Sequence, residues 1–309
     1  MSGRQYDRQG RGLRWQTVVG PRSGSPAGSG GWWIRTWVIS GPMGDNGTQP
    51  RVLGNRFADA VRPSDGQPDR DLCRCVGYSG ATRPAGVSFH SDRQDTASPG
   101  WQHLLALIEE AVADSRTVFK PFAELSADER RQIVTLPPTI ANLTEVKHLV
   151  LYGTNLTRIP PEIGAMANLE VFEPYTSYRL HWYPYELTRC TRLRASTVST
   201  RALYGNVKFR PPFPSLRPVT TVAEADFAQL DPGTWGVAEV ATCSVCAGPF
   251  DQELHQAWIS LAVATDVLPL LVNACSPACL AAVPPADSSY VSTFHRGGPD
   301  LAQPTTRGR

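Results

Sequence analysis

Hydrophobic residues recur at a regular spacing in the middle of the chain, between Leu136 and Val198. The spacing is 23 residues from Leu136 to Ile159 and 24 residues from Ile159 to Tyr183. Such a period is typical of repeat proteins, in which each unit buries its apolar side only by stacking on its neighbours. The matching positions are Leu136, Pro137, Ile140, Leu143, Val146, Leu149 and Leu151; Ile159, Pro160, Ile163, Met166, Leu169, Phe172 and Pro174; and Tyr183, Pro184, Leu187, Cys190, Leu193, Ser196 and Val198.

Two stretches carry the motif most clearly. Residues 146–151 read V-x-x-L-x-L, and residues 159–169 read I-P-x-x-I-x-x-M-x-x-L. This pattern resembles the leucine-rich repeat family, in a short form of bacterial type, with the repeats at residues 136–216. The resemblance implies an α/β fold, a short solenoid in which each unit is one strand and one return segment. Repeat positions 1, 4 and 6 are then expected to point inward, namely Val146, Leu149 and Leu151; Leu169, Phe172 and Pro174; and Leu193, Ser196 and Val198.

The chain departs from the family pattern at its turns. The asparagine that bonds the turn backbone in the family is replaced by Thr154, Ser177 and Arg201, and one residue is inserted between the second and third copies. The third layer is also polar, at Ser196. We therefore expect a short and irregular solenoid.

Helical segments precede the repeats. Residues 101–112 carry apolar side chains at helical spacing. Ser126 and Glu129 have the spacing of a capping box, and they begin a short second helix that runs through Val134. Terminal repeats need a cover for their exposed core, so residues 100–135 are expected to form a helical cap.

Four cysteines form two close pairs, Cys243 with Cys246 and Cys275 with Cys279. This spacing is typical of a four-thiolate zinc site. Two disulfides or four buried free thiols are the alternatives, but paired short spacings in a chain without a convincing secretory signal favour zinc. Because all four ligands would be thiolates, no coordination position stays open, and the zinc is expected to be structural.

The residues around these pairs predict their local structure. Ala-Gly-Pro at 247–249 predicts a tight turn, and Ser-Pro at 276–277 predicts a helix start. Residues 258–263 and 267–272 read as the strands of a hairpin that turns at Thr265-Asp266. The order of these elements, a tight turn (the knuckle) at the first cysteine pair, a hairpin and then a helix at the second pair, resembles a treble-clef zinc finger. We expect residues 235–285 to form a small α+β zinc module that unfolds on chelation while the repeats stay folded.

The remaining segments read as non-globular. Residues 1–99 contain no Lys and no Glu and are rich in Gly, Pro, Ser and Arg, so a disordered leader is expected. Residues 217–234 read as a linker and residues 286–309 as a disordered tail. Within the leader, the apolar patch at 32–39 is too short to span a bilayer, and the C-x-C at 73–75 lacks a second cysteine pair nearby.

Charge argues against some classes of partner. The 309-residue chain has a net charge of +2, and no Arg or Lys occurs between Trp235 and Tyr290. Phosphate contacts from basic side chains supply most nucleic-acid affinity. The sequence therefore argues against nucleic acid and anionic membranes as partners, and a cytoplasmic location is expected.

The outward positions of the repeat strands predict a recognition surface. Tyr152, Glu173 and Tyr175 occupy such positions, and the aromatic-rich loop after the second copy adds Arg179 and Trp182. Tyrosine, tryptophan and arginine dominate binding hot spots because they bury large areas and carry a polar tip. Packing of the same aromatic residues in the core is the alternative. We predict that these five residues bind a protein partner.

Catalytic motifs are not found. The chain has no phosphate-binding glycine loop, no nucleophile elbow and no metalloprotease motif. Cys190 occupies an inward repeat position, where a buried thiol is inert. The sequence predicts a non-enzymatic protein-binding adaptor with a structural Zn²⁺. A zinc-finger nucleic-acid-binding regulator is the second interpretation, and a cysteine-dependent effector enzyme is the third.

Overall fold

The chain divides into two units, Met1–Ala60 and Val61–Arg309. In the first unit the described part is a short antiparallel pair, β1 (Gln5–Tyr6) and β2 (Gly12–Leu13). None of the helices described here is long and apolar enough to cross a membrane. The computed structural model describes residues 5–6, 12–13, 89–90, 92–205, 212–216, 242–250, 253–287, 290–291 and 293–302.

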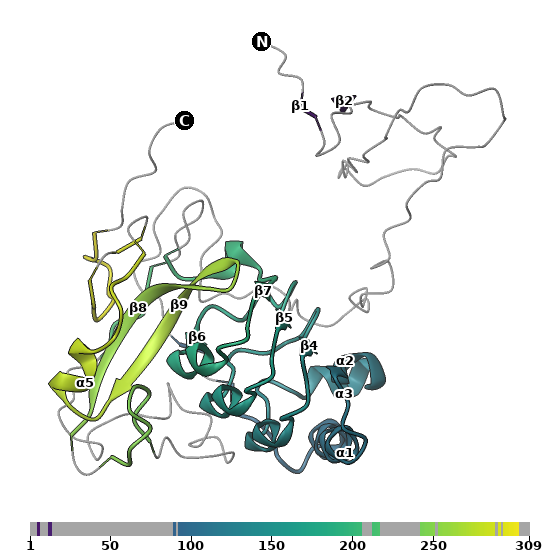
Figure 1. Ribbon diagram of the computed structural model, residues 1–309. Coiled ribbons are helices and arrows are strands. Elements are labelled where there is room, and N and C mark those ends of the chain that lie inside the picture. Colours follow the sequence, from purple (N-terminus) through teal and green to yellow (C-terminus); the bar gives the residue numbers. More distant parts are fainter. Residues whose placement is uncertain are drawn as a thin grey trace, which may run out of the picture. The chain divides into compact units, whose positions relative to one another are not determined.

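The second unit is a mixed α/β structure with one parallel and one mixed sheet. The parallel sheet has the strand order β3-β4-β5-β7. Its strands lie side by side, with short 3-10 helices stacked on the other side of the repeats (Figure 1). The strands are β3 (Val118–Phe119), β4 (His148–Val150), β5 (Val171–Glu173) and β7 (Ala195–Ser196). The 3-10 helices are η1 (Pro138–Asn142), η2 (Pro161–Ala165), η3 (Tyr185–Arg189) and η4 (Thr200–Ala202).

The strands of the parallel sheet pair at matching positions of the hydrophobic pattern. Leu149 pairs with Phe172, and Phe172 pairs with Ser196, in parallel register. All three are buried, whereas their strand neighbours His148 and Val171 are partly exposed. Successive side chains of a strand alternate between its two faces, so one face of the sheet closes the core and the other meets solvent. Of the positions predicted to point inward, only Leu193 is partly exposed.

Buried hydroxyl groups lie at the turns that follow β4 and β5. The Ser177 hydroxyl donates to the Leu151 carbonyl at 3.0 Å and accepts the Thr154 N–H at 3.2 Å. The Thr154 and Ser177 oxygens lie 2.7 Å apart. These buried bonds satisfy backbone groups that would otherwise be left without water, so the Ser177 side chain stabilises the turn and the Thr154 hydroxyl contacts it.

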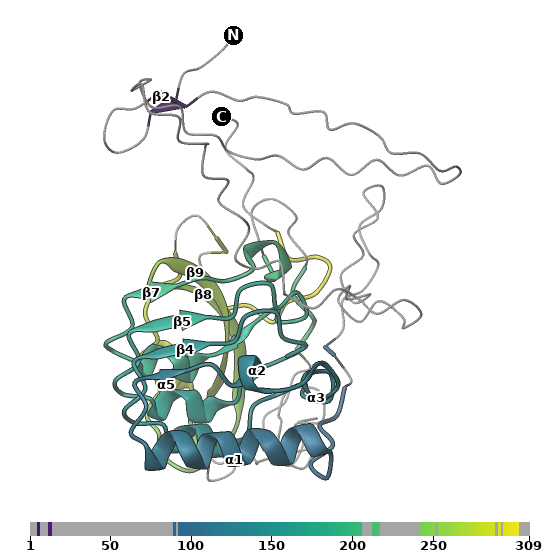
Figure 2. The same cartoon turned by 90° about the vertical axis from the view of Figure 1, so that its right-hand side faces the viewer.

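Three helical segments precede β4 in the chain and pack together. Helix α1 (Pro99–Ala113) packs against α2 (Pro121–Glu124), α3 (Ala127–Arg131) and η1 (Figure 2). The capping box of Ser126 and Glu129 is present. The second helix is shorter than predicted and ends before Val134, because Val134 N–H bonds to Gln94 Oε1 at 2.9 Å instead of to a helical carbonyl.

The mixed sheet has the order β6-β9-β8 and joins the third repeat to the cysteine-rich segment. β8 (His255–Val263) and β9 (Asp266–Ala274) form the predicted hairpin, and β6 (Tyr183–Pro184) pairs with β9 in parallel. The hairpin turns at Ala264 and Thr265, one residue earlier than predicted. Ala264 adopts a positive φ of 54°, which allows this two-residue turn.

The polar third layer of the repeats meets this hairpin turn. The Ser196 hydroxyl donates to Asp266 Oδ2 at 2.7 Å, and the Ser196 N–H donates to Thr265 Oγ1 at 3.0 Å. A serine at an inward position would otherwise leave polar groups unpaired at the end of the sheet. The repeats and the cysteine-rich segment consequently share one hydrophobic core.

Parts of the expected leader and tail are packed. Phe89 stacks on Trp258 with ring centroids 5.7 Å apart, and Gln94 Nε2 donates to the Gln132 carbonyl at 3.0 Å. His295 exchanges two backbone hydrogen bonds with Trp258. The predicted linker, the apolar patch at 32–39 and the cysteines at 73 and 75 lie outside the described residues.

Candidate functional site

The first cysteine pair lies on a tight turn, as predicted. Cys243 N–H donates to the Gly248 carbonyl at 2.8 Å, and Ala247 N–H donates to the Cys243 carbonyl at 3.0 Å. Ala247 has a positive φ of 61°, which turns the chain back after Cys246. The turn is also attached to β9, because Ser244 N–H donates to the Asn273 carbonyl at 2.8 Å.

The second pair lies where β9 ends and a helix begins. Helix α5 (Pro277–Ala281) starts after Ser276, whose hydroxyl accepts the Cys279 N–H at 3.1 Å. Cys275 precedes this cap, and Cys279 lies in the first turn. The predicted N-cap and the proline at the first helical position are both confirmed.

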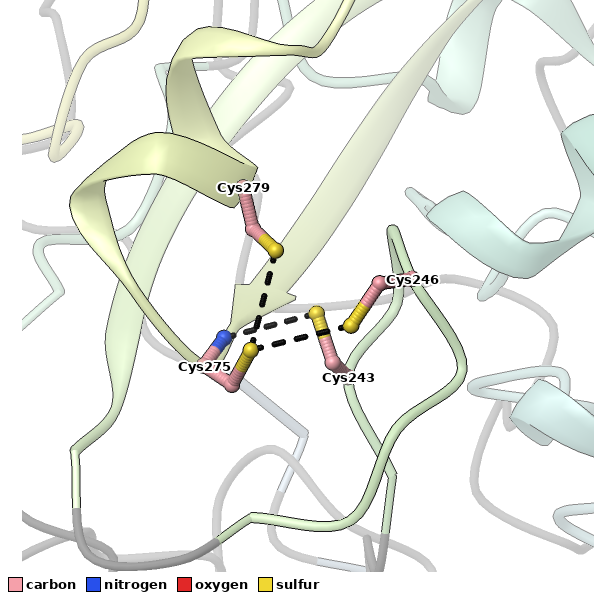
Figure 3. A group of neighbouring side chains, drawn as sticks. All are labelled: Cys243, Cys246, Cys275 and Cys279. Atoms are coloured by element: carbon pink, nitrogen blue, oxygen red, sulfur yellow. Dashed lines mark hydrogen bonds between the residues drawn. The ribbon is translucent and has the colours of Figure 1, made fainter.

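The four thiols form a single cluster (Figure 3). Their sulfur atoms all lie within 4.8 Å of one another, with Cys246 Sγ 3.7 Å and Cys279 Sγ 3.6 Å from Cys275 Sγ. Zinc–sulfur bonds of about 2.3 Å in a tetrahedron place sulfurs about 3.8 Å apart, whereas a disulfide needs about 2.05 Å. All four cysteines are free. The cluster can therefore hold one metal ion, and its spacing is compatible with zinc.

The thiols of Cys243 and Cys275 differ in pKa. Burial alone would raise the pKa of the Cys243 thiol, but backbone N–H groups of the turn and of Cys275 outweigh it and lower that pKa to about 7. The N–H donors of Val245 and Cys275 each lie 3.4 Å from Cys243 Sγ. Hydrogen bonds with the Cys279 and Cys246 thiols raise the pKa of Cys275 to about 12. Four adjacent thiolates repel one another, so full ionisation of the cluster requires a cation.

The fifth described cysteine is a core residue. Cys190 is buried, and its thiol donates to the Ile163 carbonyl at 3.2 Å. Burial raises the pKa of this thiol to about 12. His181 is bonded elsewhere, with Nδ1 2.6 Å from the Ala202 carbonyl. The predicted inert role of Cys190 agrees with these contacts.

The exposed face of the parallel sheet brings together three of the five predicted partner-binding residues. The Tyr152 and Tyr175 rings lie 6.1 Å apart, and Tyr175 is 44% exposed. Glu173 Oε2 lies 3.1 Å from His148 Nε2. We call this surface the sheet face. The same face contains Val118, Val150, Val171 and Ala195.

Arg179 and Trp182 do not belong to the sheet face. Trp182 is 4% exposed and packs edge-on against Phe89 and Trp258. The Arg179 side chain is 13% exposed, and its Nη2 lies 2.7 Å from Asp92 Oδ2. Predicting them on the binding surface was wrong because their partners lie in segments that the sequence places outside the repeats.

Sequence reasoning also missed a contact beside the metal cluster. Arg189, on η3, donates from Nη2 to the carbonyls of Cys243 and Ser244, both at 2.8 Å. Glu186, one turn earlier, is buried, and burial raises its pKa while a bond from the Ser244 hydroxyl opposes the shift. No local signal marks either residue, since neither belongs to the hydrophobic repeat pattern.

Comparisons with known proteins add nothing further to the site. No protein-family model matches this chain, and no curated protein is significantly similar to it. Any assignment of function depends on the geometry and chemistry of the chain itself.

Proposed function

We propose that this chain is a non-enzymatic adaptor that binds a protein partner through the sheet face and contains a structural zinc. The fold we infer is a short leucine-rich-repeat solenoid with an N-terminal helical cap, closed at its other end by a treble-clef-like zinc module. Three units with one strand and one 3-10 helix each, in the register Leu149, Phe172, Ser196, support the solenoid.

The observation that carries the binding role is the composition of the sheet face. Val118 on β3 is 43% exposed, and Tyr175, in the turn after β5, is 44% exposed. The Tyr175 carbonyl accepts the Gly153 N–H at 2.9 Å, which fixes the backbone of this turn. Aromatic and aliphatic side chains on a rigid element lose little conformational entropy on binding, which is the property of hot-spot residues. The His148–Glu173 pair adds a polar centre that can orient a partner.

The class of partner follows from charge. The segment between Trp235 and Tyr290 contains no Arg or Lys, and Tyr152, Glu173 and Tyr175 on the sheet face carry no positive charge. Nucleic-acid binding needs several basic contacts to phosphates. A protein surface with apolar side chains fits this face better. We place the protein in the cytoplasm, where the cysteine thiols stay reduced and available to a metal.

The zinc would be structural. Four thiolates saturate a tetrahedral zinc, so no position stays open for water or a substrate. The knuckle at 243–248, the hairpin β8-β9 and the helix α5 follow the order of a treble clef. We infer that the metal closes the end of the repeat core and does no chemistry of its own.

A pull-down with the full-length chain tests the binding role. Partners captured by the wild type are identified and their dissociation constants measured against purified variants. Tyr152→Ala and Tyr175→Ala are each expected to weaken binding by about 1–2 kcal/mol without unfolding the protein. Tyr178→Ala is the matched control, since Tyr178 is also 44% exposed but is not one of the sheet-face residues. Equal affinities for Tyr175→Ala and wild type would refute the sheet face as the binding site.

A further inference from the structure

The cysteine-rich segment has a charge imbalance of its own. Between Trp235 and Tyr290 it contains five acidic residues and no Arg or Lys. A divalent ion bound by four thiolates adds two further negative charges. Nearby positive charge stabilises such a centre, because it favours the ionised form of the thiols. The five acidic residues are Glu239, Asp251, Glu253, Asp266 and Asp287.

The third repeat supplies a positive charge at the metal knuckle. Arg189 extends from η3, and its Nη2 donates to two consecutive carbonyls, those of Cys243 and Ser244, at 2.8 Å each. Charge-assisted hydrogen bonds of this kind are about twice as strong as neutral ones. The carbonyls belong to the first two peptide units of the knuckle, so Arg189 holds the part of the turn that presents Cys243.

Each of these peptide units has a second bond on its opposite side. In a trans peptide the carbonyl and the N–H point in opposite directions, and none of the described peptides is cis. The unit that gives the Ser244 carbonyl to Arg189 directs the Val245 N–H to Cys243 Sγ, 3.4 Å away. A donor on the carbonyl strengthens the N–H of the same peptide as a donor. Arg189 therefore acts on the thiolate through one peptide plane.

The other unit is held in the same way. Its carbonyl, that of Cys243, accepts from Arg189, while its N–H, that of Ser244, donates to the Asn273 carbonyl on β9 at 2.8 Å. The Ser244 hydroxyl accepts the Asn273 N–H at 3.0 Å. The knuckle is thus bonded both to the third repeat and to β9.

We propose that Arg189 is a positioning residue of the metal centre: it orients the knuckle peptides toward Cys243 Sγ and offsets the negative charge of the loaded site. This inference rests on the proposed metal centre. Its consequence is that zinc affinity depends on a repeat residue distant in sequence from every cysteine.

Zinc affinity of full-length variants tests the proposal, by competition with a chromophoric chelator. Arg189→Met, which keeps the length but removes charge and donors, is expected to bind zinc at least about tenfold more weakly. Arg189→Lys keeps the charge but replaces the planar, pre-organised donor group by an ammonium on a flexible stem, so its zinc affinity should fall between those of Arg189→Met and wild type. Arg192→Met, an exposed arginine of the same repeat bonded to Asn168, is the control and should bind normally.

A spectroscopic readout separates this role from general destabilisation. In the cadmium-loaded protein, the Val245 amide proton should resonate downfield in the wild type and move upfield in Arg189→Met. Unchanged zinc affinity in Arg189→Met, or an equal loss in Arg192→Met, overturns the proposal while the metal centre stands. If Arg189→Met does not fold, Arg189→Lys is tested in its place. A wild-type zinc affinity together with an unshifted Val245 amide proton in Arg189→Lys then overturns the proposal. A wild type that binds no metal overturns the metal centre and this proposal together.

Discussion

Tyr183 of the third repeat pairs with Leu270 of the cysteine-rich hairpin in parallel register. A backbone pairing of this kind makes one sheet of two segments that the sequence places in separate domains. Residues of both also share one hydrophobic core. The two segments are therefore expected to behave as one cooperative unit.

Removal of the metal should destabilise the repeats as well as the cysteine module. We expect excess chelator to lower the midpoint of a single thermal transition, because a ligand at a hundred times its Kd contributes about 2.7 kcal/mol. Hydrogen exchange of the amides of η2 and η3 measures the effect on the repeats. If chelation opened only residues 242–287 and left those helices protected, the independent module expected from sequence would be right.

Leu149→Ala should lower the free energy of unfolding by about 2–5 kcal/mol by opening a cavity. Leu149 is buried in the middle strand of the parallel sheet and is paired with Phe172. Tyr175→Ala, in the exposed turn after β5, should change stability by less than about 1 kcal/mol. Urea denaturation compares the two, and a larger loss for Tyr175→Ala would mean that this tyrosine is packed.

Gly164→Ala should also destabilise the repeats, although it adds a single methyl group. A Cβ at Gly164 would approach the Glu186 carbonyl oxygen to 2.7 Å, which requires η2 and η3 to move apart. Overpacking of this kind costs about 1–3 kcal/mol. Ala165→Ser, at the exposed neighbouring position, is the control. Equal melting temperatures for Gly164→Ala and wild type would show that the two helices can separate freely.

Acid should destabilise the protein from about pH 6.5 downward. His181 is fully buried, its ring stacks on that of His90 at 5.1 Å, and burial lowers its pKa to about 3. The folded state keeps this histidine neutral, while the unfolded state binds a proton below about pH 6.5. Stability is therefore lost as pH falls through the unfolded pKa, by about 2 kcal/mol at pH 5 for one such group.

His181→Gln tests this pH dependence, because it removes one titrating group from the buried stack. The groups around the stack are Asp92, Arg158, Arg179 and Tyr204. The variant should lose stability at pH 8 but show a shallower decline between pH 7 and pH 5. An identical slope in wild type and variant would exclude His181 as the source.

The pairing of the β4 and β5 strands and the cysteine cluster could be predicted from sequence because their signals are local. Leu149 and Phe172 occupy equivalent positions, 23 residues apart, in the hydrophobic pattern. Cys275 and Cys279 are separated by three residues, so their spacing is visible in the sequence. The polar residue Ser196 at an inward position could not be explained from the hydrophobic spacing. Its hydrogen-bond partner, Asp266, is 70 residues away in the sequence.

Long-range pairing explains the predictions that failed. Aromatic and arginine side chains serve equally well in a core and on a binding surface, so Trp182 and Arg179 could not be placed without knowing their neighbours. Those neighbours, Phe89 and Asp92, lie in a segment whose composition predicts disorder. Arg189 was missed for the same reason, because its role depends on a knuckle more than fifty residues later.

Native mass spectrometry of the purified full-length chain is the most direct test of the proposed zinc site. One zinc ion per chain is predicted for the wild type, and none for Cys275→Ser, which removes a ligand from the middle of the cluster. A wild-type mass without metal, and lower by four hydrogens, would show two disulfides in place of a zinc site and would contradict it.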